Sequence, residues 1–475
     1  DLDGVYRGGQ GHDALYGEGG DDTYHFNRGD GKDTLVELGG SDRILMGDGI
    51  ALEDVEVTAD GDDIVVKLFD NGVLSSDQLT IRDGFLGADK VVENIEFADG
   101  RSLSITDILA GPIEVNGTAG NDVTLEGSTN HADIIRGYEG NDTLNGNGGE
   151  DEIYGGAGDD TINGGADADQ LHGGDGNDTI QGLGGDDTIY GDAGNDTLSG
   201  HHETDQLYGG EGNDSLNAYN GDDRLEGGTG ADTLNGGHGD DRYHFNRGDG
   251  ADVIFDESGD NDTIVFGDGI SKDDLLIAIQ PHGNSSHTTY DDIIVNVLDN
   301  GQATGDRIEL TYNRGFEAYK VENLEFSDGS RITVSELMAE KGVEYLGNSN
   351  GNTLRGIADL DGVYRGGQGH DALYGEGGDD TYHFNRGDGK DTIIDIGGND
   401  QIVFGAEILP DGVKLVSSGD DLVVQLWEND VLSSDSITLS GALTDANKQV
   451  ETFEFADGSE TTLVELIAQS EDPLL

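Results

Sequence analysis

Single apolar residues recur every nine positions between Gly137 and His244, each two residues after an aspartate. The full pattern is GGxGxDxUx, where U is apolar, and it repeats twelve times without a shift. Between glycine turns, the three residues xUx leave room only for a short strand with one inward side chain. A fixed period this short predicts a stack of identical units and excludes an ordinary globular domain.

Longer apolar–polar alternation follows each run of repeats. In the first copy it covers Ile64–Phe69, Gln78–Ile81 and Val92–Phe97, with turn residues at 70–72 and 98–100. This pattern predicts an antiparallel β module. Three closing segments are compatible with either short helices or strands: Leu103–Leu109, Ile332–Met338 and Leu463–Ile467.

The chain also repeats on a larger scale. Residues 1–34 recur letter for letter at 359–392, and the similarity continues at the same offset of 358, while a third copy starts at Gly239 and carries an extra loop, Gln280–Tyr290. We expect each module to close the open end of a repeat run and to cover its strand edges. The predicted organisation is 1–35 short roll, 36–112 module, 113–255 long roll, 256–342 module, 343–393 short roll and 394–475 module.

Composition points to a cation. The chain has 24 basic and 100 acidic residues, a formal net charge of −76, 81 glycines and no cysteine. Without a counter-charge such a chain repels itself, and it is a poor partner for nucleic acid or an anionic membrane surface. The lack of cysteine excludes thiolate zinc sites and disulfides.

The candidate ligands are the sixth-position aspartates. Carboxylates in glycine turns, joined by turn carbonyls, form the flexible all-oxygen site that suits Ca²⁺ better than Mg²⁺. Asp167 and Glu203 replace the fourth-position glycine, and we expect weaker binding or distortion at those turns. The candidate metal ligands are Asp142, Asp151, Asp160, Asp169, Asp178, Asp187, Asp196, Asp205, Asp214, Asp223, Asp232 and Asp241 in the long run, and Asp13, Asp22, Asp33, Asp252, Asp371, Asp380 and Asp391 in the shorter segments.

This pattern resembles the RTX, or haemolysin-type calcium-binding, repeats of proteins exported by bacterial type I secretion, and the module resembles the related region that often follows them. The resemblance implies an all-β fold, a calcium-bound right-handed parallel β-roll with eighteen residues per coil. Alternate nonapeptides would then stack, so that Asp142 and Asp160 share one edge while Asp151 and Asp169 share the other. Each ion would lie between successive turns of one edge, which allows up to five interior sites per row. It also implies secretion and folding on export into extracellular calcium.

Other motifs have simpler explanations within the repeat. Arg-Gly-Asp at 28–30, 247–249 and 386–388 fits the terminal repeat NRGDGxD better than a host-cell ligand. Tyr-His-Phe at 24–26, 243–245 and 382–384 is interpreted as an aromatic plug where roll meets module, in preference to a sugar-binding face. Asp472-Pro473 is weak evidence of self-processing, and no nucleophile elbow, Walker loop or dinucleotide fingerprint is present.

The sequence therefore predicts a non-enzymatic, calcium-binding structural segment of a large secreted or surface protein of a Gram-negative bacterium, such as an adhesin, surface-layer subunit or filament. Because the chain starts inside a repeat, we expect it to be part of something longer. Expected partners are calcium and neighbours by self-association or in the extracellular matrix, with no membrane insertion. The alternatives are the accessory tail of a secreted enzyme (alginate epimerase, lipase or protease), with a role in export, folding and polysaccharide binding, and the repeat domain of an RTX toxin.

Overall fold

A computed structural model of the chain describes residues 2–70, 72–85, 90, 92–105, 111–281, 291–311, 321–429 and 431–469. The chain divides into two compact units, Asp1–Arg242 and Tyr243–Leu475, and each is described by itself. Most of the predicted loop Gln280–Tyr290, the end of Leu103–Leu109 and the pair Asp472-Pro473 lie outside the described residues.

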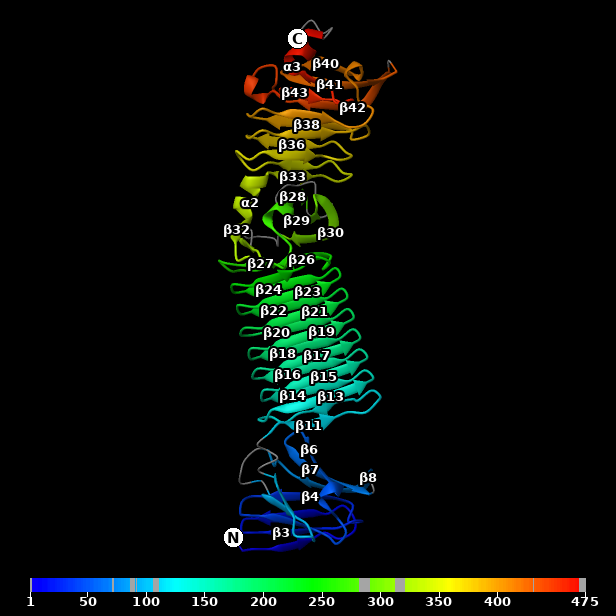
Figure 1. Cartoon of the computed structure of the whole chain (residues 1–475), viewed down its shortest axis with the longest axis vertical. Helices are drawn as coiled ribbons and strands as arrows, with labels where there is room; N and C mark the ends of the chain where they lie inside the picture. Colours follow the sequence, from blue (N-terminus) through cyan, green and yellow to red (C-terminus); the bar gives the residue numbers. More distant parts are fainter. Residues whose placement is uncertain are drawn as a thin grey trace. The chain divides into compact units, whose positions relative to one another are not determined.

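The long roll of the first unit consists of two parallel sheets whose strands alternate along the chain (Figure 1). Partners are eighteen residues apart, as in the pairing of Ile153 with Leu171, which confirms the eighteen-residue coil. One sheet contains β11 (Ile113–Asn116), β13 (Asp133–Glu139), β15 (Glu152–Ala157), β17 (Gln170–Asp175), β19 (Thr188–Ala193), β21 (Gln206–Glu211) and β23 (Arg224–Thr229). The other contains β12 (Leu125–Glu126), β14 (Thr143–Gly148), β16 (Thr161–Ala166), β18 (Thr179–Gly184), β20 (Thr197–His201), β22 (Ser215–Asn220) and β24 (Thr233–His238).

The apolar residue of each repeat forms the core of this roll. These side chains are 0–2% exposed, because the strand turns its single large apolar side chain inward while its neighbours face out. The buried column comprises Ile135, Leu144, Ile153, Ile162, Leu171, Ile180, Ile189, Leu198, Leu207, Leu216, Leu225 and Leu234. Successive coils thus stack one apolar layer on the next.

The fourth position of the repeat requires a positive φ. A Cβ atom added to Gly176, at φ +146°, would overlap the carbonyl oxygen of Gly158 one coil earlier. Asp167 and Glu203, which replace this glycine, take φ values of 73° and 68°, in the left-handed region. Their turns therefore do differ from the neighbouring ones, as the sequence predicted.

The first short roll and its module share two sheets. The five-stranded sheets have the orders β1-β3-β5-β9-β10 and β2-β4-β8-β7-β6. Their bounds are β1 (Val5–Arg7), β2 (Ala14–Glu18), β3 (Thr23–Phe26), β4 (Lys32–Glu37), β5 (Arg43–Met46), β6 (Val55–Asp60), β7 (Asp63–Asp70), β8 (Val73–Ile81), β9 (Asn94–Glu96) and β10 (Ser102–Ser104), with a short 3₁₀ helix at Leu52–Asp54. Because β4 pairs in parallel with module strand β8, the expected boundary after residue 35 falls within β4.

The second unit repeats this plan with a second and a third module. Its first part contains β25 (Arg242–Phe245), β26 (Ala251–Phe255), β27 (Thr263–Phe266), β28 (Leu275–Pro281), β29 (Asp291–Asp299), β30 (Gln302–Leu310), β31 (Asn323–Glu325), β32 (Arg331–Thr333) and α2 (Val334–Lys341). Its second part contains β33 (Val343–Leu346), β34 (Thr353–Arg355), β35 (Gly362–Arg365), β36 (Ala372–Glu376), β37 (Thr381–Phe384), β38 (Lys390–Asp395), β39 (Gln401–Phe404), β40 (Val413–Ser418), β41 (Asp421–Glu428), β42 (Val431–Leu439), β43 (Thr452–Glu454), β44 (Glu460–Thr462) and α3 (Leu463–Gln469). Short 3₁₀ helices lie at Lys272–Asp274, Pro410–Gly412 and Ala446–Lys448.

The middle module covers an edge and also begins a new one. Strands β28, β29 and β30 form the predicted antiparallel meander, and β30 pairs in parallel with roll strand β26. The outer strand β28 pairs in parallel with β33, the first strand of the following roll. In this copy the module therefore passes the sheet on to the next roll instead of only closing the previous one.

Two of the closing segments are helices. Helix α2 begins after Thr333, whose hydroxyl accepts a hydrogen bond from the Glu336 amide at 3.1 Å while the Glu336 carboxylate accepts from the Thr333 amide at 3.0 Å. This reciprocal capping fixes the start of the helix. Helix α3 begins at Leu463 in the equivalent place of the last module.

Aromatic residues pack in columns along the rolls. The tyrosine and phenylalanine of each Tyr-His-Phe segment are 0–3% exposed, which confirms the predicted plug. On the outer face of the long roll, four rings stack at centroid distances of 4.6–5.0 Å, so that their faces cover one another. These rings belong to Tyr154, His172, Tyr190 and Tyr208.

Candidate metal centre

The sixth-position aspartates form two hydrogen-bonded rows. In every step of both rows the backbone amide of one aspartate donates to Oδ1 of the aspartate in the next coil, at 2.7–2.9 Å. The first row is Asp142, Asp160, Asp178, Asp196, Asp214 and Asp232, and the second row is Asp151, Asp169, Asp187, Asp205, Asp223 and Asp241. The alternating arrangement expected from the resemblance is therefore present.

The second carboxylate oxygen of these aspartates is buried without a protein partner. The side chains are 0–4% exposed. Oδ2 has no hydrogen-bond partner among the described residues in Asp142, Asp151, Asp160, Asp169, Asp178, Asp187, Asp196, Asp205, Asp214 and Asp223. A buried ionised oxygen needs a compensating charge, so each row presents a line of oxygens that suits a bound cation.

The first glycine of each repeat opens space beside these oxygens. A Cβ atom on Gly137 would lie 2.5 Å from Asp142 Oδ2 and 2.5 Å from the carbonyl oxygen of Gly155 in the next coil. At Gly191 the same two kinds of oxygen, from Asp196 and Gly209, would lie at 2.5 and 2.6 Å. Carboxylate and carbonyl oxygens thus converge where any side chain would obstruct them, and this donor set fits Ca²⁺.

Burial makes several of these carboxylates weak acids in the absence of a cation. The pKa of Asp169 is raised to about 8, mainly by burial and also by the neighbouring carboxylates of Asp151 and Asp187, against a lowering by the hydrogen bond from the Asp151 amide. Burial likewise raises the pKa of Asp205 to about 8 and that of Asp196 to about 7. A divalent ion that favours the ionised form would reverse this effect.

The predicted ligands of the shorter segments occupy equivalent places. Asp13 and Asp371 donate through their amides to Oδ1 of Asp33 and Asp391, at 2.9 and 3.0 Å. Asp13 is half-buried, and the other six (Asp22, Asp33, Asp252, Asp371, Asp380 and Asp391) are 1–3% exposed. The spacing within these rows is twenty residues instead of eighteen.

Sequence reasoning missed several members of the rows. Asp133 precedes the second row and donates to Asp151 at 2.7 Å. Asp42 and Asp400 follow Asp22 and Asp380, whose amides donate to them at 2.6 and 2.9 Å. The signal for the last two was present in the letters Gly-Gly-Ser-Asp at 39–42 and Gly-Gly-Asn-Asp at 397–400, but the twenty-residue spacing breaks the nonapeptide pattern.

One glutamate of each module accepts a hydrogen bond from an aspartate at the end of the preceding roll. Glu93, Glu322 and Glu451 accept hydrogen bonds from the amides of Asp42, Asp262 and Asp400, at 2.5, 3.0 and 2.8 Å. The module thereby supplies the acceptor that a further coil would have provided.

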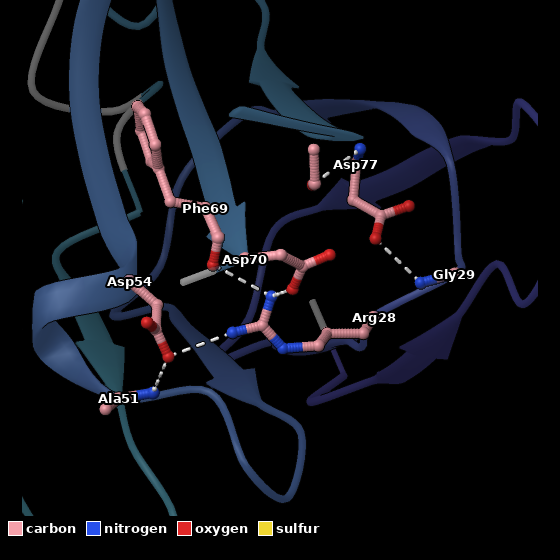
Figure 2. A network of polar contacts seen from close by, with 8 residues as sticks. Arg28, Gly29, Ala51, Asp54, Phe69, Asp70 and Asp77 are labelled. Atoms are coloured by element: carbon pink, nitrogen blue, oxygen red, sulfur yellow. Dashed lines mark hydrogen bonds and ion pairs between the residues drawn. The ribbon is translucent and has the colours of Figure 1, made fainter. Parts of the chain in front are cut away.

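A second joint between roll and module uses the Arg-Gly-Asp segment (Figure 2). The Arg28 guanidinium forms ion pairs with Asp54, at 2.9 Å, and with Asp70. The next amide, that of Gly29, donates to Asp77 Oδ2 at 2.7 Å. These contacts connect the last turn of the roll to the 3₁₀ helix and the hairpin of the module, and they give the segment a structural role.

The other two segments make related contacts. Gly248 and Gly387 donate to Asp306 and Asp435 at 3.0 and 2.9 Å. The aspartates of the three Arg-Gly-Asp segments are only 6–8% exposed. An integrin-type ligand needs both its arginine and its aspartate accessible, so this geometry disfavours the adhesive interpretation.

Family models match both parts of this architecture. The model of the RTX calcium-binding nonapeptide repeat (4 copies) matches residues 2–35, overlapping segments from 128 to 251, and 359–390. The chain contains RTX calcium-binding repeats. The haemolysin-type calcium binding protein related domain matches residues 60–107 and 417–463, within the first and third modules.

Other comparisons add little to this assignment. No curated protein matches the RTX chain. Among solved structures 15 chains match, one of which is the extracellular lipase LipA from Serratia marcescens, at 17% identity over 54% of this chain and 37% of that chain, with a TM-score of 0.17. The match thus spans little more than a third of the lipase, and a similarity at this level carries no argument about activity.

RTX nonapeptide repeats bind Ca²⁺, and several groups of buried aspartates in the described part of this chain could hold such ions. No helix in the described part of the chain is long and apolar enough to span a membrane.

Proposed function

We propose that this chain is a non-enzymatic, calcium-folded structural segment of a larger secreted bacterial protein, such as an adhesin, a surface-layer subunit or a filament. The observation that carries this proposal is the pair of buried aspartate rows with ten unpartnered carboxylate oxygens. When its buried carboxylates are ionised, such a roll is stable only with cations bound, so ion binding and folding are coupled.

Calcium availability then decides where the chain folds. Affinities of extracellular calcium modules, on the order of 10⁻⁴ to 10⁻³ M, leave such sites empty in the cytosol and filled outside the cell. With a net charge of −76, the calcium-free chain is strongly self-repelling. Such a chain is open during export and becomes stiff afterwards, as a spacer requires.

The outer face of the long roll favours a structural role over polysaccharide binding. The stacked rings of Tyr154, His172, Tyr190 and Tyr208 cover one another's faces, with Arg136 and Arg224 over the two ends of the column at 5.8 and 4.7 Å. Sugar rings stack on open aromatic faces, and these faces are already occupied.

Static light scattering and far-UV circular dichroism during a calcium titration test the proposal. From EDTA to about 10 mM calcium, which exceeds the range of extracellular modules, we expect the β signal to rise cooperatively. Growth in mass would indicate an assembling filament or lattice unit, and compaction at constant mass would indicate a spacer. A chain that is fully folded in EDTA at pH 9, where the buried carboxylates are ionised, would refute the proposal.

A further inference from the structure

The last coil of the first and third rolls differs from the interior coils in its carboxylates. Ligand atoms of Asp22, Glu37 and Asp42 lie within 4.8 Å of one another, and all three side chains are 1% exposed. The equivalent group of the third roll is Asp380, Asp395 and Asp400, also 1% exposed each. We call these two groups the terminal carboxylate clusters.

The additional carboxylate stands where the interior repeat has glycine. Glu37 precedes Asp42 by five residues, the same separation as between Gly137 and Asp142 in the nonapeptide. In the interior, the open face of Gly137 meets the carbonyl oxygen of Gly155. At Gly17 in the terminal coil, the corresponding face meets the Glu37 carboxylate together with Asp22 Oδ2. A charged oxygen therefore replaces a neutral one.

The first cluster is pre-organised and incomplete. The Tyr24 hydroxyl donates to one carboxylate oxygen of Glu37, and the Leu38 amide donates to the other at 2.9 Å. Asp22 Oδ2 and Asp42 Oδ2 are buried and have no hydrogen-bond partner among the described residues.

The second cluster repeats this arrangement with a shorter side chain. The Tyr382 hydroxyl donates to Asp395, whose other oxygen accepts from Gly397 at 3.1 Å. Asp380 Oδ2 and Asp400 Oδ2 likewise lack a partner in the described part of the chain. Two copies that differ at the glycine-replacing position, Glu37 and Asp395, have thus kept a carboxylate there.

We propose that each terminal carboxylate cluster binds one Ca²⁺ ion through three carboxylates, at a site distinct from and tighter than those of the interior rows. Calcium affinity rises with the number of charged ligands and with site rigidity. Glu37 and Asp395 end β4 and β38, strands that also pair with the module strands β8 and β42, so the ion ties the roll to the module at this end. This inference rests on the proposed function, because it takes calcium as the ion that folds the chain.

Equilibrium dialysis of the full chain with radioactive calcium tests this site. Ligand atoms of Asp241, Asp256 and Asp262, at the end of the second roll, also lie within 4.8 Å of one another. We therefore expect the wild-type chain to show a tight class of three ions. The double variant E37Q/D395N should lose two of them and keep the remaining stoichiometry. The control D99N/D457N removes the same charge from exposed turns of the two modules and leaves the tight class intact. A double variant whose isotherm equals that of the control overturns the inference.

Variants that change only the length of the carboxylate side chain provide a second test. They preserve the charge, and the result does not depend on whether the double variant folds. E37D and D395E each change the reach of one ligand, and we expect each to shift the affinity of one tight ion with the stoichiometry unchanged. Unchanged isotherms in both variants count against the site. A wild-type chain that binds no calcium would instead refute the proposed function itself, and a wild-type chain that binds calcium without a tight class would refute only this inference.

Discussion

The aspartate rows predict the cost of removing one member. Asp187 is 0% exposed, and its Oδ1 accepts the Asp169 amide at 2.9 Å. Alanine at position 187 leaves this buried amide without an acceptor, which costs about 1–3 kcal/mol, and it also removes a ligand oxygen from the row. The loss corresponds to about a 5- to 150-fold fall in the folding equilibrium constant at fixed calcium.

Asparagine separates the two contributions. Asp187→Asn keeps an oxygen that can accept the Asp169 amide and removes only the charge. We therefore expect the free energy of unfolding of Asp187→Ala to be lower than that of Asp187→Asn by most of the hydrogen-bond cost. Both variants should need more calcium than wild type to fold, because each loses a charged ligand.

Urea unfolding followed by circular dichroism, at about 10 mM calcium and again across a calcium titration, measures both effects. The neighbouring Asp186 gives the matched control, because it is exposed and its carboxylate accepts the Thr204 amide at 3.0 Å. If Asp187→Ala and Asp186→Ala shift the calcium midpoint equally, the sixth-position aspartates are not the ligands and the reasoning fails.

Three further predictions concern the same coil and its surroundings. Gly182→Ala should raise the calcium concentration at the folding midpoint, because its Cβ would overlap the Asp187 carboxylate. Gly184→Ala should leave that midpoint unchanged, because its Cβ would meet only the Gly165 carbonyl oxygen, at 4.0 Å. Equal midpoints for the two variants would contradict this prediction. Leu198→Ala should lower the free energy of unfolding in urea by about 2–5 kcal/mol, and Leu183→Ala, at a half-exposed leucine, by less than about 0.5 kcal/mol. A small effect of Leu198→Ala would refute the assignment of Leu198 to the core. In EDTA, burial raises the pKa of Asp169 from 3.8 to about 8, so this aspartate stabilises the calcium-free roll fully below pH 3.8 and the stabilisation is lost as the pH rises through about 8. Circular dichroism in EDTA from pH 5 to pH 9 should therefore show a declining β signal, and an increase would contradict this prediction.

The sequence predicted the interior of the long roll well because every physical constraint there has the same period. The turn glycines, the buried apolar residue and the aspartate all recur together, as at Gly182, Asp187 and Ile189. One alignment of letters therefore fixes the strand, the core and the row at once.

The places where a roll meets a module were harder to predict, because the contacts there join residues far apart in the sequence and leave no local pattern. The twenty-residue step from Asp22 to Asp42 hides the continuation of the row, and nothing local shows that Glu93 supplies its last acceptor, fifty-one residues further on. The pairing of β28 with β33 likewise depends on a strand that follows a helix, and the expectation of a simple closing module did not include it.

The two-row construction also restricts how such a chain can change in length. Each row consists of alternate nonapeptides, and one row of each short roll ends at a particular acceptor of the following module, Glu93 or Glu451. Deleting one nonapeptide would move every later aspartate to the opposite row and present the wrong row to that acceptor. Deleting two would remove one complete coil and leave both ends unchanged. Duplications and losses in the gene should therefore survive in steps of eighteen residues, so that the roll contains a whole number of coils.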